Sequence, residues 1–170
     1  MYMQVTMGRL SFDTNLFEQV QSGKGYEFNG FNKPILGGLW CSTYTTEDQF
    51  VSDWQYWTET EGFMQQYQGI KFEIKADARI LEIETIEDIA ALTSKYGHNI
   101  DFEALSLDYD VLHLTRKGNA LKSTTFQMWD VESSVIMNAE VVYHVQSFTL
   151  APEVFATKVW DDEASTYLCH

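Results

Sequence analysis

The chain is poor in cysteine and has no long apolar run, and each shortage argues against a class of protein. Its two cysteines, Cys41 in an apolar context and Cys169, have no spacing that suggests a disulfide framework or a zinc motif. Its apolar runs are short and broken by charge, and its first residues lack the basic and then apolar pattern of a secretory signal. The four histidines are scattered as well. We therefore expect a cytoplasmic protein with no membrane contact and no metal.

Basic residues are also scarce. The chain has 11 lysines and arginines against 25 acidic residues, a net charge of −14, and its arginines are Arg9, Arg79 and Arg116. Direct binding of nucleic acid is disfavoured, because contact with a phosphate backbone depends on basic clusters. An acidic surface fits either plain solubility or attraction to a basic protein partner, including mimicry of DNA. Charge alone leaves both explanations open.

What the sequence does have is enough apolar material for one compact domain over residues 1–170. Hydrophobic residues make up 45% of the chain and aromatic residues 15%. Alternating and helical apolar patterns together predict an α+β fold. The expected strands are 3–12, 39–44, 70–74, 79–83, 109–115, 131–137 and 141–150, and the expected helices are 46–60, 85–97 and 101–105. Between them, residues 13–33 are predicted to form a long, turn-rich connection, and residues 116–124 a polar one.

Three short segments carry residues suited to chemistry. Arg9 ends the first expected strand, where a guanidinium could clamp a phosphate or carboxylate. Ser42 and Thr43 lie in a buried strand, so one of the two hydroxyls should face the interior. Asp130 and Glu132 are two residues apart, which on an extended strand places both carboxylates on one face, and each would raise the pKa of the other if the two share a cleft.

Each of these features also has a purely structural explanation. Arg9 could form a surface ion pair, Thr43 could be an ordinary strand residue, and Asp130 with Glu132 could form a solvated strand end. The expected helix that opens at Thr46, with Gln49 as its capping-box partner, places Trp54 and Trp57 at helical spacing and turns Tyr56 outward. These aromatic residues could form a wall for a planar ring or, more often for such a stripe, part of the core.

The order of these segments resembles the ADP-ribosyltransferase fold: arginine on the first strand, Ser-Thr on the second, and an acidic pair before a late strand. The segments 32–42, 52–57 and 109–133 are also similar to a group of small uncharacterised bacterial and phage proteins that is related to that fold. The resemblance covers most of residues 5–148. It implies two small, mostly antiparallel sheets around a cleft, with flanking helices.

The resemblance also implies roles at an NAD site. Arg9 would hold a phosphate or ribose of NAD, Ser42 would steady the acid, and Thr43 would support the nicotinamide side. Glu132 would stabilise the ribosyl oxocarbenium, with Asp130 as the first acid of the pair. Two further residues would complete the cofactor site, Tyr44, in place of the final serine of the Ser-Thr-Ser pattern, and the aromatic Trp54.

The activity that follows is transfer of ADP-ribose from NAD to a macromolecule, most naturally a host protein in the host cytoplasm if the chain is encoded by a phage. Two alternatives remain at this point. One is a non-catalytic acidic inhibitor of an anti-defence type, which would use its charge to occupy a basic surface. The other is an NAD glycohydrolase, in which water is the acceptor.

Overall fold

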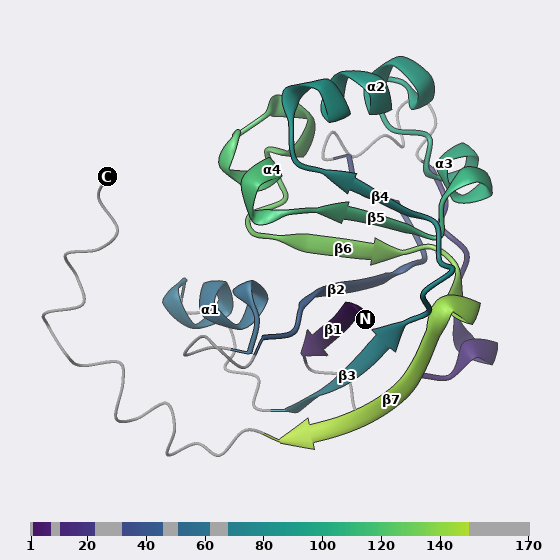
Figure 1. Ribbon diagram of the computed structural model, residues 1–170, viewed down its shortest axis with the longest axis vertical. Helices are drawn as coiled ribbons and strands as arrows, with labels where there is room; N and C mark the ends of the chain where they lie inside the picture. The colour runs from purple at the N-terminus through teal and green to yellow at the C-terminus, as the bar shows by residue number, and fades with distance from the viewer. Residues whose placement is uncertain (1, 8–10, 23–31, 46–50, 62–67, 150–170) are drawn as a thin grey trace, which may run out of the picture.

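The strands form one sheet. The structure, a computed structural model, describes residues 2–7, 11–22, 32–45, 51–61 and 68–149. The strands are β1 (Tyr2–Met7), β2 (Leu39–Thr43), β3 (Gln68–Ile74), β4 (Ile80–Ile83), β5 (Val111–Leu114), β6 (Ser133–Ile136) and β7 (Val142–Thr149). Within the described residues they form a seven-stranded sheet in the order β4-β5-β6-β2-β1-β3-β7 (Figure 1). The neighbouring strands are antiparallel apart from the parallel pair β4 and β5.

Strand β2 joins the two halves of this sheet. Its first three residues pair with β6, with Cys41 opposite Ser134, and its last two pair with β1, with Ser42 opposite Val5. The halves on either side of β2 diverge toward one end of the molecule (Figure 1). The expected α+β class is confirmed, but in place of two separate small sheets there is one continuous sheet, because a single strand uses different parts of its length for its two partners.

The helices lie mainly beside the β4-β5-β6 half of the sheet. They are α1 (Asp53–Thr60), α2 (Ile86–Tyr96), α3 (Phe102–Asp108) and α4 (Arg116–Ala120), with short 3-10 turns at Thr14–Leu16, Thr124–Phe126 and Ala139–Val141. The side chains of Ile89, Leu92 and Tyr96 bury one face of α2. They pack with Leu112 and Leu114 of β5 in the larger of two apolar clusters. Burial of each such side chain stabilises the fold by about 1.5–3 kcal/mol.

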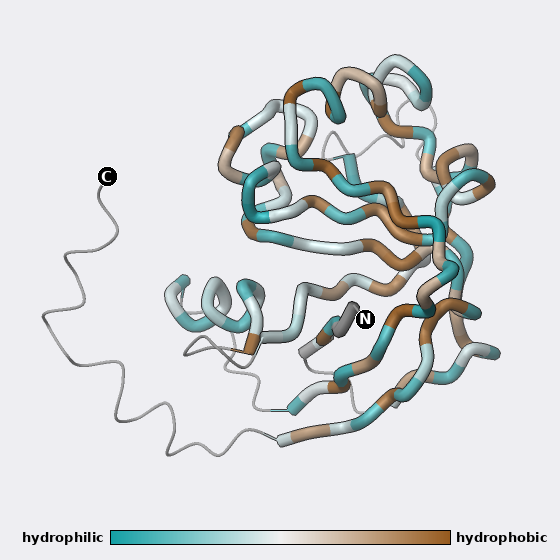
Figure 2. The backbone as a smooth tube through the Cα atoms, in the orientation of Figure 1, coloured by the Kyte–Doolittle hydropathy of each residue, from teal (hydrophilic) through white to brown (hydrophobic). Residues whose placement is uncertain are grey.

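The second apolar cluster lies on the opposite face of the same strands. Val111 and Ile136 belong to it, together with Ile70, Phe72 and Ile74 of β3. Alternate residues of β5 thus enter different clusters, as expected for a strand that is buried on both faces. Figure 2 shows the hydrophobic residues concentrated along the strands, whereas α1 is largely hydrophilic.

Local sequence signals placed several elements correctly. The capping box of Thr85 and Asp88 is formed at the start of α2, which ends at Gly97 as expected. The predicted turn between the last two strands is also present, with the Asn138 side chain accepting from the backbone N–H of Glu140.

Two helices differ from the sequence prediction, one in where it starts and one in that it was not predicted. The N-cap of α1 is Ser52, which accepts from the N–H of Gln55, rather than Thr46. Residues 46–50 lie outside the described residues. The polar stretch that begins at Arg116 contains the short helix α4, capped by Thr115. In that helix a Cβ on Gly118 would lie 2.0 Å from the carbonyl oxygen of Ile83, so the glycine lets α4 pack closely against the end of β4.

Candidate active site

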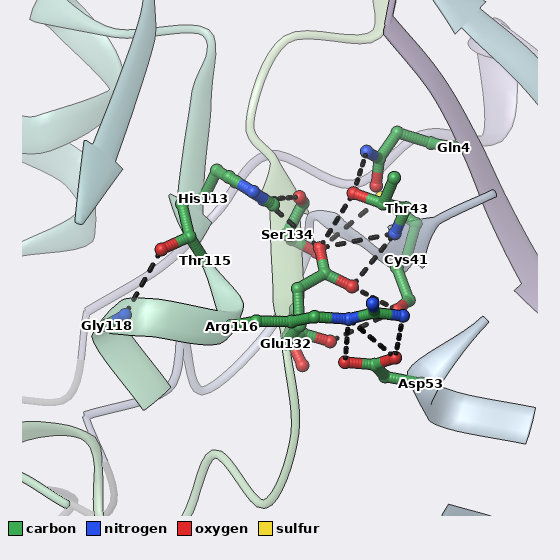
Figure 3. Close-up of polar contacts among 12 residues, drawn as sticks. Gln4, Cys41, Thr43, Asp53, His113, Thr115, Arg116, Gly118, Glu132 and Ser134 are labelled. Atoms are coloured by element: carbon green, nitrogen blue, oxygen red, sulfur yellow. Dashed lines mark hydrogen bonds and ion pairs between the residues drawn. The ribbon is translucent and has the colours of Figure 1, made fainter. Parts of the chain in front are cut away.

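Glu132 immediately precedes β6, at the point where β2 passes from β6 to β1. Cys41 lies opposite Ser134 in the antiparallel pairing of β2 and β6. Two residues further along each segment, Thr43 and Glu132 therefore come to the same level of the sheet. The Glu132 side chain is 4% exposed. Its carboxylate accepts from the Ser42 hydroxyl, from the Thr43 backbone N–H at 3.0 Å and 3.2 Å, and from the Thr43 hydroxyl at 3.0 Å (Figure 3). A single buried carboxylate is thus held by three donor groups.

The hydroxyls of Ser42 and Thr43 therefore both donate to the Glu132 carboxylate. The sequence predicts that one of them faces the interior, since neighbouring side chains of a strand alternate. Here Thr43 is the last residue of β2, and its hydroxyl and backbone N–H both reach Glu132. Ser42, fully buried, reaches the same carboxylate. The expected role of Ser42 in steadying the acid requires a contact between these two residues, and this hydrogen bond is that contact.

Asp130 does not share this environment. Residues 130–132 precede β6 rather than forming part of it, and Asp130 is exposed whereas Glu132 is buried. The expectation that the two carboxylates share one face of an extended strand is therefore wrong. The nearby charge that raises the pKa of Glu132 is that of Asp53. Asp130 and Glu132 do line one small pocket together.

A second layer of polar residues supports the first. Gln4 of β1 is fully buried and donates from Nε2 to the Thr43 hydroxyl at 3.3 Å. On the other side of the carboxylate, the buried His113 of β5 places Nδ1 3.3 Å from Glu132 Oε1 and 2.7 Å from Ser134 Oγ. A chain of polar contacts therefore crosses four neighbouring strands, from β1 through β2 and β6 to β5.

Burial shifts the pKa of both titratable groups in this cluster, Glu132 and His113. It raises the pKa of Glu132, although the bonds from Ser42 and Thr43 act in the opposite direction. Burial also lowers the pKa of His113 to about 4, so the imidazole is neutral at pH 7. The contact between His113 and Glu132 is therefore one between a neutral ring and a carboxyl group.

Glu132 lines two surface hollows. The larger is a cleft with a volume of about 520 Å³. Its lining includes Glu132, His113, Tyr44, Glu84, Arg116 and Lys117. The smaller pocket, about 250 Å³, is lined by Asp53, Tyr56, Asn119 and Asp130 and again by Arg116 and Glu132. Glu132 thus lines both hollows, although only 4% of its side chain is exposed.

The remaining sequence-predicted residues are dispersed. Arg9 lies outside the described residues. Tyr44 lines the larger cleft, with Lys71 Nζ 5.1 Å from its ring centre. Trp54 is half-buried, donates from Nε1 to Ser133 Oγ at 3.0 Å, and does not line either of the two hollows just described. In α1 the only buried side chain is that of Gln55, so the aromatic stripe of Trp54 and Trp57 is not a core stripe.

The cleft residues that sequence reasoning missed include His113, Arg116 and Lys117. His113 could not be found from spacing, because its partners are far away in the chain. Arg116 and Lys117 did leave a signal, since a basic pair directly after a strand and an N-capping threonine is unusual in so acidic a chain.

Comparison with known protein families, with curated proteins and with solved structures finds no match to this chain. In the parts of the chain that the structure describes, no helix is both long enough and apolar enough to cross a membrane. The same residues contain no group of three or more histidine, cysteine, aspartate or glutamate side chains placed to hold a metal ion.

Proposed function

We propose that this chain cleaves the bond between nicotinamide and ribose in NAD and transfers ADP-ribose to a protein, with Glu132 as the central catalytic residue. The observation that carries the proposal is the Glu132 carboxyl group, held by Ser42 and Thr43 at the edge of the 520 Å³ cleft. The resemblance of the sequence to the ADP-ribosyltransferase fold implies this same combination of residues.

The chemistry requires a negative charge that is fixed before the reaction begins. When the glycosidic C–N bond breaks, its electron pair leaves with nicotinamide and positive charge develops on the ribose. An ionised Glu132 beside that ribose would stabilise the cation, and a carboxylate already oriented by donors need not reorganise as the charge appears. An acceptor group then attacks the same ribose carbon and loses a proton.

The protonation state of Glu132 sets the conditions for this step. Burial raises its pKa, so only the fraction of molecules ionised at a given pH would be competent. Activity should therefore increase as the pH rises through that pKa. The positively charged nicotinamide ring of bound NAD would favour the ionised form and shift this rise to lower pH.

The test follows nicotinamide release from NAD by the purified protein, alone and with a cell lysate. We expect Glu132→Gln to keep the fold and to slow release by about a hundredfold or more. Glu140→Gln is the matched control, because Glu140 is an exposed glutamate in the turn after the far end of β6. It should release nicotinamide at the wild-type rate.

The lysate separates the two NAD-cleaving activities. Labelling of lysate protein from NAD would support transfer, whereas release without labelling would identify a glycohydrolase. If the wild-type protein releases no nicotinamide in either condition, or if Glu132→Gln releases it at the wild-type rate, the proposed role of Glu132 is wrong. A salt-sensitive pull-down of basic proteins would then test the acidic interaction protein.

A further inference from the structure

An ion pair joins two helices at the edge of the proposed site. Arg116, the first residue of α4, donates from Nη2 to Asp53 Oδ1 at 2.6 Å and from Nε to the two Asp53 oxygens at 3.1 Å and 3.0 Å. Asp53 is the first residue of α1. In Figure 3 the Arg116 side chain points toward Asp53. Arg116, Asp53 and Glu132 all line the smaller pocket, so the ion pair and the residue on which the proposed reaction depends share one hollow.

Arg116 shares both surface hollows with Glu132. Arg116 and Glu132 line both the larger cleft and the smaller pocket, whereas Asp53 lines only the smaller one. A ligand that extends from one hollow into the other therefore has Arg116 as well as Glu132 among the residues around it. For NAD, the group next to the reacting ribose is a diphosphate.

The Arg116 guanidinium can bind a phosphate in place of the Asp53 carboxylate. A guanidinium offers a planar fork of donors that fits a phosphate as well as a carboxylate. The Arg116 side chain is 62% exposed and that of Asp53 22% exposed. Because most of the Arg116 side chain is exposed, a diphosphate with two negative charges can reach the guanidinium and compete with Asp53 for it.

We infer that Arg116 binds the diphosphate of the nucleotide, and that Asp53 holds the guanidinium in place until the ligand displaces it. Asp53 is then an internal competitor of the substrate. The second cation of the cleft, Lys117, has a comparable exposed contact with Glu84 at 3.3 Å. Arg116 differs from Lys117 in lining both hollows. This inference rests on the proposed function for the identity of the ligand, but its test measures binding.

The test is calorimetric titration of the full chain with ADP-ribose at one fixed salt concentration. Because hydrogen bonds to charged groups are strong, Arg116→Gln should weaken binding by about ten- to a hundredfold. Asp53→Asn, which removes the competing charge, should tighten binding by about two- to fivefold. In the double variant the effect of Asp53→Asn should disappear, because there is no guanidinium left to release.

Two controls test whether the change in affinity for ADP-ribose comes from contact between Arg116 and the diphosphate. Lys95→Gln breaks another exposed ion pair, with Asp108 at 2.9 Å, and lowers the net charge by the same amount, but Lys95 does not line either hollow. It should bind ADP-ribose as the wild type does. Adenosine, which has no phosphate, should bind the wild type and Arg116→Gln equally. Thermal unfolding followed by circular dichroism checks that each variant is folded.

Several results would overturn the inference. The inference is wrong if the wild type does not bind ADP-ribose, or if Arg116→Gln binds it with wild-type affinity. It is also wrong if Asp53→Asn changes the affinity equally with and without Arg116. The proposed function is decided separately by nicotinamide release. If NAD is cleaved but the Arg116 and Asp53 variants bind like the wild type, only this inference fails. If ADP-ribose binding follows the expected pattern but NAD is not cleaved, only the proposed reaction fails.

Discussion

Replacement of Ser42 by alanine tests the reasoning about the buried carboxyl group without any assumption about a substrate. Ser42 is fully buried, and its hydroxyl donates to Glu132. Removal of the hydroxyl takes one donor from a carboxylate that is itself 4% exposed and has little access to water. A hydrogen bond to a charged group contributes about 1.5–3 kcal/mol, so its loss should raise the pKa of Glu132 further.

The sign of the pH dependence follows from the direction of that shift. Because folding raises the pKa of Glu132, the folded state binds the proton more tightly than the unfolded state, whose ordinary value is 4.5. The free energy of unfolding therefore falls as the pH rises from about the unfolded value to the raised folded value. In Ser42→Ala this window should extend to higher pH. The variant should lose most stability relative to the wild type above the folded pKa, and least where Glu132 is protonated in both.

The assay is urea denaturation of both proteins at a series of pH values, with the pKa of Glu132 followed by carbon-13 NMR of its carboxyl group. Ser134→Ala is the matched control. Ser134 is an equally buried serine on the neighbouring strand, and its hydroxyl contacts His113 at 2.7 Å. Its loss should not extend the pH window of Glu132. The reasoning is refuted if Ser42→Ala lowers stability equally at every pH and leaves the pKa of Glu132 unchanged.

Two further predictions concern stability. Burial lowers the pKa of His113 from 6.5 to about 4, so the unfolded state binds more protons between these values and His113 makes the fold less stable as the pH falls through them. Between pH 7 and pH 4 the free energy of unfolding should therefore fall by about 3 kcal/mol less in His113→Asn, which retains a side-chain donor, than in the wild type. Urea denaturation at the two pH values measures this difference, and an unaltered pH profile in the variant would contradict the prediction. Gly37 has a φ of +79°, and a Cβ there would lie 2.1 Å from the carbonyl oxygen of Gln19. Gly37→Ala should therefore lower the melting temperature measured by circular dichroism far more than Ala91→Gly, which replaces an exposed residue inside α2.

The sequence alone determined the features that depend on neighbouring residues. Alternating apolar residues located β3 and β4, an apolar segment located the buried strand β2, and the Thr85 and Asp88 pair located the start of α2. Strand patterns and helix capping involve residues only a few positions apart. The same local reasoning failed at α4, where a short polar helix depends on packing against β4 rather than on its own apolar face. The α1 start also differed, since Ser52 rather than Thr46 provides the cap.

Only the tertiary structure decided which polar groups meet. Ser42 and Glu132 are 90 positions apart, and the register of β2 against β6 brings them into contact. That register also separates Glu132 from Asp130, its near neighbour in sequence, by burying one and exposing the other. His113 and Arg116 join the site because β5 lies next to β6 and α4 follows β5. Sequence reveals the residue types suited to a reaction, whereas pairing between distant strands determines their distances, their burial and therefore their protonation.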